Sequence, residues 1–67
     1  MKKAKWRRTS GMEASGLVCR MALVDVETGE ELWACKFWPW SSRSADEAYE
    51  MAAAVEQRLA AEGYTIE

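Results

Sequence analysis

The chain has no histidine, one proline and only two cysteines among its 67 residues. Histidine is the commonest general base and the commonest metal ligand, so its absence argues against catalysis and against a metal site. Two cysteines are too few for a disulfide framework, and no apolar run approaches the roughly 18 residues of a membrane span. No apolar segment follows the basic N-terminus, as one would in a signal peptide. We therefore expect a cytoplasmic, non-enzymatic protein with reduced thiols and no cofactor.

What the chain does have is an uneven charge and many tryptophans. Residues 1–20 contain six cations and one acid, whereas residues 21–67 contain three cations and ten acids. A chain of this length forms a single domain, residues 1–67, whose core is small. Such a core cannot hide all four tryptophans, and tryptophan is enriched where proteins bind partners. The composition therefore favours a binding protein.

Residues 17–40 are the central feature, because two apolar alternating runs flank Glu27-Thr28-Gly29. This pattern predicts a β-hairpin with a type I turn, a glycine in the left-handed conformation and a bulge, which places Val26 opposite Glu30. Counting outward from that turn pairs Leu23 with Trp33. Because side chains alternate across a strand, the register sorts the hairpin into two faces.

One face, which we call the inner face, is continuously apolar and is expected to form the core. Its members are Leu17, Cys19, Met21, Leu23, Trp33, Cys35 and Phe37. The other, the outer face, contains two cations. Its members are Val18, Arg20, Ala22, Val24, Val26, Leu32, Ala34, Lys36, Trp38 and Trp40. Arg20 and Lys36 are expected to be direct neighbours, an arrangement that is unfavourable unless an anion or a carboxylate lies between them.

The flanking segments complete the predicted fold. Residues 1–9 are interpreted as a first strand or as a basic arm, and residues 10–16 as a loop. Ser44 and Glu47 fit a capping box that opens a helix over about residues 45–62, with Gly63 as its stop. The apolar stripe of that helix is Ala48, Met51, Ala52, Val55 and Leu59. Residues 65–67 form either a frayed tail or a short strand. The predicted class is α+β, with a three-stranded antiparallel sheet in β-β-β-α order and the helix on the inner face.

The leading functional hypothesis is a small protein-binding module that contacts a larger protein through the outer face. Its expected contact residues are Arg20, Lys36, Trp38 and Trp40. The alternative is a nucleic-acid-binding domain, because cations interleaved with an aromatic residue suit phosphates and bases. Its expected contacts are Lys3, Lys5, Trp6, Arg7 and Arg8, together with the outer face. A homodimer that stacks two outer faces is a third possibility, since an exposed apolar patch usually marks an interaction.

Three resemblances accompany these hypotheses. The hairpin followed by a serine-led, alanine-rich helix, Ser44 to Leu59, resembles the C-terminal half of double-stranded-RNA-binding domains, although acids stand at the helix start where that family has lysines. The turn residues 25–30 and the helix opening at 46–48 are similar to the arm-type DNA-binding domains of phage integrases, which implies DNA contacts by Arg20, Lys36 and Trp38. In size and acidity, the chain resembles phage-borne inhibitors of bacterial defence, such as anti-CRISPR proteins, which implies occlusion of a site on a larger protein.

Overall fold

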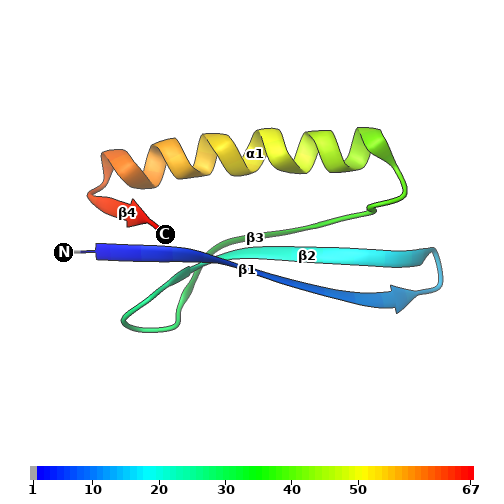
Figure 1. Cartoon of the computed structure of the whole chain (residues 1–67), viewed down its shortest axis with the longest axis horizontal. Coiled ribbons are helices and arrows are strands. Elements are labelled where there is room, and N and C mark those ends of the chain that lie inside the picture. The colour runs from blue at the N-terminus through cyan, green and yellow to red at the C-terminus, as the bar shows by residue number, and fades with distance from the viewer. Residues whose placement is uncertain (1) are drawn as a thin grey trace.

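The computed structural model describes residues 2–67 and contains a mixed sheet and one helix (Figure 1). The elements in chain order are β1 (Lys2–Glu13), β2 (Gly16–Asp25), β3 (Glu31–Phe37), α1 (Ser42–Ala61) and β4 (Tyr64–Ile66). The strands lie in the order β3-β2-β1-β4, and β4 runs parallel to β1 while the other pairs are antiparallel. The predicted α+β class is confirmed. The predicted sheet is wrong in one respect, because a fourth, parallel strand is present.

The fourth strand forms because α1 returns the chain to the beginning of β1. The helix starts beside the end of β3 and runs back over the sheet (Figure 1). Gly63, with a φ of 99°, then reverses the chain in the left-handed conformation that glycine adopts most readily. Tyr64–Ile66 consequently lie beside residues 2–4 of β1. Of the two interpretations of residues 65–67, the short strand is correct for residues 65 and 66.

The first strand is longer than expected. Residues 2–9 are a strand and not a free arm, and the strand continues through the predicted loop as far as Glu13. Each residue from Ala4 to Glu13 has a partner on β2, and only residues 14 and 15 form the turn. The serine and glycine content suggested a loop, but ten consecutive pairings with β2 outweigh this local preference.

The β2–β3 hairpin confirms the predicted register over its central part, where Leu23 lies opposite Trp33. The register shifts beyond Leu23, so the predicted pairing of Val26 with Glu30 is wrong. Asp25 causes the difference: its carboxylate accepts hydrogen bonds from two amides of the turn, at 2.9 and 3.1 Å, and its own N–H donates to the Glu30 carbonyl at 2.8 Å. Gly29 has the expected positive φ, 77°.

The core lies between α1 and the inner face, as predicted. Leu23 is fully buried against the second half of α1, and Met21 and Phe37 pack against its first half. Trp6 adds to this core from β1, with its ring 6.0 Å from that of Trp33 and perpendicular to it. Two expected core residues are exposed instead, because they lie at the margins of the contact: Leu17 is 43% exposed and Met51 is 48% exposed.

The helix begins three residues earlier than predicted. Its N-cap is Ser41, whose hydroxyl accepts a hydrogen bond from the Ser44 amide at 3.3 Å. Ser44, the predicted cap, instead accepts a hydrogen bond from the Trp38 amide at 3.0 Å. Both serines therefore stabilise the connection between β3 and α1, but only the first caps the helix.

Replacement of Ser41 by alanine should lower the free energy of unfolding by about 1 kcal/mol, because an amide of the first turn loses its acceptor. Ser42→Ala is the matched control, since Ser42 is exposed and lies inside the helix; its effect should stay within about 0.5 kcal/mol. Chemical denaturation followed by circular dichroism measures both. Equal destabilisation by the two substitutions would contradict the assigned cap.

Candidate functional site

The two outer-face cations are neighbours, as predicted, but each already has a carboxylate partner within the chain. Arg20 lies opposite Lys36. The Arg20 guanidinium donates two hydrogen bonds to Glu31, at 2.6 and 2.9 Å, and Lys36 donates to Glu13 at 2.7 Å. Arg7 of β1 adds a third contact, to Glu31 at 3.2 Å. The carboxylates that the paired cations required are therefore supplied by β1 and β3.

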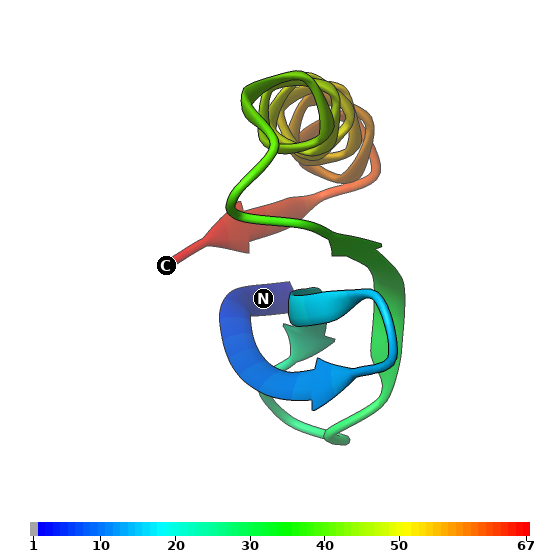
Figure 2. The same cartoon turned by 90° about the vertical axis from the view of Figure 1, so that its right-hand side faces the viewer.

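The central apolar residues of the outer face are buried, so the expected exposed apolar patch is reduced to its end at Val26, which is 40% exposed. Val18 is 6% exposed, Ala22 1% and Val24 3%. Within residues 2–67, no helix covers this side, because α1 packs on the inner face. The strands are strongly curled when viewed end-on (Figure 2). Arg7 lies opposite Ala22 on this face, and we attribute the burial to the curl and to the long aliphatic stems of Arg7 and Arg20.

Trp38 and Trp40 lie outside the sheet, which corrects their predicted place on the outer face. β3 ends at Phe37, and the Ser41 amide donates to the Trp38 carbonyl, so these tryptophans flank a turn at Pro39. The Trp38 indole N–H donates to the Ser15 hydroxyl at 3.1 Å, and that of Trp40 donates to the Leu17 carbonyl at 3.0 Å. They therefore join the β3–α1 connection to the β1–β2 turn, and Trp40 remains 63% exposed.

The basic residues of β1 do not form one surface, because they alternate between the two sides of the sheet. Lys5 and Arg7 lie opposite Val24 and Ala22, on the outer face, and Lys3 shares that side by alternation. Trp6 and Arg8 point toward the helix instead. A single partner cannot contact all five residues from one side.

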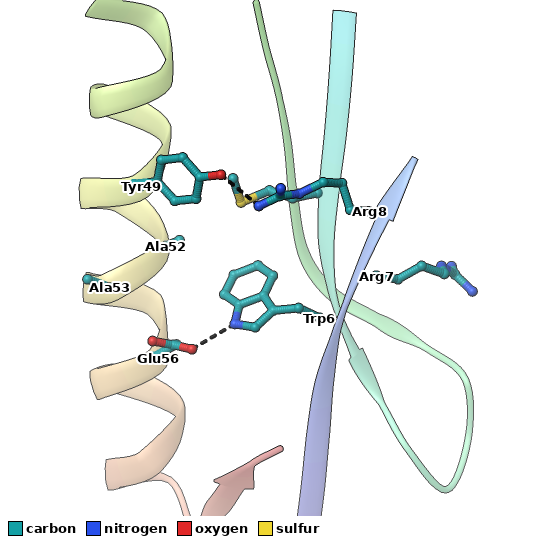
Figure 3. A pocket seen from close by; sticks show the side chains of 8 residues that line it. Trp6, Arg7, Arg8, Tyr49, Ala52, Ala53 and Glu56 are labelled. Atoms are coloured by element: carbon teal, nitrogen blue, oxygen red, sulfur yellow. Dashed lines mark hydrogen bonds between the residues drawn. The ribbon is translucent and has the colours of Figure 1, made fainter. Parts of the chain in front are cut away.

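Trp6 and Arg8 line a groove of about 290 Å³ between β1 and α1 (Figure 3). The Trp6 indole N–H donates to Glu56 at 2.7 Å, and Arg8 donates to the Tyr49 hydroxyl at 2.7 Å. The Arg8 guanidinium also lies 5.7 Å from the centre of the Tyr49 ring. Arg7, Met21, Ala52 and Ala53 complete the lining. The groove thus has an apolar interior with a polar pair at each end.

One side of this groove is a free strand edge. β4 pairs with β1 only along residues 2–4, and the Glu67 amide donates to the Ala4 carbonyl at 2.8 Å. From Trp6 to Glu13, no described strand lies on that side of β1. Met12, on this edge, is 76% exposed, the largest value among the large apolar side chains described. A free edge next to an apolar groove can accept another extended chain.

Hydrogen-bond geometry identifies which backbone groups of the edge are available. The Val26 amide donates to the Lys3 carbonyl, so the odd-numbered residues of β1 exchange hydrogen bonds with β2. The even-numbered residues therefore direct their N–H and C=O groups outward, which the bond from Glu67 to the Ala4 carbonyl confirms. Trp6, Arg8, Ser10 and Met12 consequently present the free donors and acceptors.

The helix side of this groove was missed in the sequence, although a signal was present. Tyr49, Ala52, Ala53 and Glu56 recur at i, i+3, i+4 and i+7, which is a second helical stripe that shares Ala52 with the core stripe. It contains two small residues between a tyrosine and an acid, so it has little hydrophobicity of its own. Only the position of β1 beside it reveals that these four residues face a common space (Figure 3).

No protein-family model, no curated protein and no solved structure matches this chain. Within residues 2–67, no helix is long and apolar enough to cross a membrane. In the same residues, no cluster of three or more histidine, cysteine or acidic side chains could hold a metal ion. The functions proposed below therefore rest on the geometry of the groove, the free edge and the outer face.

The ion pairs of the outer face predict a pH dependence of stability. The hydrogen bonds from Arg20, assisted by Arg7, lower the pKa of Glu31 from 4.5 to about 2. The ionised carboxylate therefore stabilises the fold fully above pH 4.5, and this contribution is lost as the pH falls toward 2. In Glu31→Gln, the free energy of unfolding should fall less steeply across this window. Glu27→Gln, at an exposed turn acid, is the control, and an unchanged slope in Glu31→Gln would contradict the assignment.

Proposed function

We propose that this chain is a non-enzymatic protein-binding module that takes up an extended segment of a partner along the free edge of β1. The observation that supports this most directly is that the unpaired edge of β1 borders the groove between β1 and α1. In strand addition, main-chain hydrogen bonds supply affinity, and pockets for alternate side chains supply specificity. The outward backbone groups and the groove meet these two requirements.

The groove favours a partner segment with an apolar side chain flanked by polar ones. Ala52 and Ala53 leave room above Met21, and burial of one apolar side chain there contributes about 1.5–3 kcal/mol. The Arg8–Tyr49 pair at one end is positioned to receive a carboxylate or a carbonyl oxygen. Glu56, held by Trp6, is positioned to receive a donor at the other end.

The proposed contact surface continues beyond the groove to the exposed apolar side chains near the β1–β2 turn. Met12 lies opposite Leu17, which is 43% exposed, and Trp40 donates to the Leu17 carbonyl. Of the residues expected to bind a partner, Trp40 is therefore retained, whereas Arg20 and Lys36 hold intramolecular ion pairs. A chain that binds in this way would act by occlusion, as an inhibitor of a larger protein does.

Proline at Ser10 tests the proposal. The Ser10 amide points away from β2, so Ser10→Pro removes a donor of the free edge without breaking the β1–β2 ladder. A displayed library of short random peptides, selected on the wild-type protein, should give ligands whose affinity falls about tenfold or more in Ser10→Pro.

Ser10→Ala is the matched control and should keep the affinity, because it retains the amide. Circular dichroism verifies that both variants fold. Ligands that bind Ser10→Pro as tightly as the wild type would contradict strand addition at this edge.

A second candidate, nucleic-acid binding, is favoured by one observation: five cations and only two acids share the outer side of the sheet. The cations are Lys3, Lys5, Arg7, Arg20 and Lys36, and the acids are Glu13 and Glu31. Trp6 cannot stack on a base there, because it packs under α1 and donates to Glu56. Any such binding would therefore be directed at phosphates and would weaken steeply with salt.

Titration of labelled duplex DNA and single-stranded RNA separates the two candidates. The protein-binding proposal expects no tight complex at low salt. A complex that weakens with salt and with Lys5→Glu, but not with Arg43→Glu on the exposed side of α1, would favour the second candidate instead.

A further inference from the structure

We infer that the free edge of β1 pairs with β1 of a second copy of this chain, antiparallel, about a two-fold axis at Ser10. The inference rests on the proposed function, since it names an occupant of the same edge. An exposed edge of this length is a template for pairing, and proteins normally shield such an edge. A two-fold contact requires an edge that is complementary to itself, and this edge has that property.

The backbone allows this register. In an antiparallel pair, residues that exchange hydrogen bonds must both direct their groups toward the other strand. The outward residues of β1 are even-numbered, so a two-fold axis at Ser10 brings Ser10 opposite its own copy and Arg8 opposite Met12. These pairs can exchange hydrogen bonds in both directions, and the two sheets become one continuous sheet.

The side chains favour the same register. Arg7, which bonds Glu31 within its own chain, falls opposite Glu13 of the second copy, which bonds Lys36, so the exposed ion pairs of the two outer faces join into one network of opposite charges that symmetry repeats. Met12, which is 76% exposed in one copy, falls beside Arg8 of the other copy. It lies on the helix side of the sheet, next to the groove that Tyr49 and Trp6 line. The most exposed large apolar side chain described is thereby covered, and each copy contributes a residue to the groove of the other.

The position of β4 excludes the register that is shifted by one residue toward the start of β1. An axis at Thr9 would place Glu13 of the second copy opposite Lys5, next to Glu67, whose amide bonds the Ala4 carbonyl. Glu67 already occupies this part of the edge, so the second copy cannot pair there. With the axis at Ser10, Ala14 of the second copy lies opposite Trp6, so the contact ends two residues before it would reach Ala4.

Sedimentation equilibrium over a range of protein concentrations tests the inference. The wild type should form a dimer, and Arg7→Glu or Glu13→Arg alone should weaken it about tenfold or more, because each places like charges opposite each other. The double variant Arg7→Glu/Glu13→Arg should dimerise again, and circular dichroism verifies that each variant folds, because the substitutions also reverse a charge beside Glu31 or Lys36 within the chain. A mixture of the two single variants should form a heterodimer, since both of its facing pairs are then of opposite charge.

Glu27→Arg, with the same charge change in the β2–β3 turn, is the control and should dimerise as the wild type does. A monomeric wild type at all concentrations, or a dimer that neither single charge reversal weakens, would overturn the inference. The proposed function has a separate outcome. If the wild type is monomeric but its selected peptides lose affinity in Ser10→Pro, only the second copy is excluded; if they keep affinity, strand addition fails as well.

Discussion

The described residues contain one helix, which has to complete a core against a four-stranded sheet. One helix is too narrow to cover the whole sheet, and this constraint governs the rest of the structure. α1 packs on the inner face, where Leu23, Met21 and Phe37 are buried, and its two buried alanines, Ala48 and Ala52, allow close approach. α1 does not extend over the free edge of β1, because the groove lies between them. Trp6 spans part of that distance, with its ring against Trp33 and its N–H on Glu56. The groove is the space left between the side of α1 and the free edge of β1 (Figure 3).

The outer face shows how the side of a sheet that no described helix covers can still exclude water from its apolar residues. Its small and branched apolar residues, Ala22, Val18 and Val24, are almost fully buried although no helix lies over them. The strands curl around this face (Figure 2), and the Glu31 carboxylate bonds both Arg7 and Arg20, whose long side chains lie on it. Exposed ion pairs of this kind contribute little stability individually. Here they also orient the side chains that cover the apolar residues.

The same shortage leaves the features on which the proposed function depends. β4 is only three residues long and occupies the first part of the outer edge of β1, so the remaining edge keeps its donors and acceptors. The exposed Met12 lies at the far end of that edge, and the exposed Leu17 of β2 and Trp40 lie near it, beside the β1–β2 turn. Strand addition, by a partner segment or by a second copy, would satisfy the backbone groups and cover these side chains together.

The sequence alone determined the helix, the central hairpin and the inner face, because each depends on short-range periodicity: the stripe at Ala48, Ala52 and Val55, and the alternation around Leu23. Tertiary structure decided what depends on distant segments. β4 needs β1 beside it, the length of β1 needs ten partners on β2, and burial of the outer face needs the curl of the sheet. The groove also belongs here: Tyr49 and Glu56 are ordinary helix-surface residues until packing brings Arg8 and Trp6 within hydrogen-bonding distance.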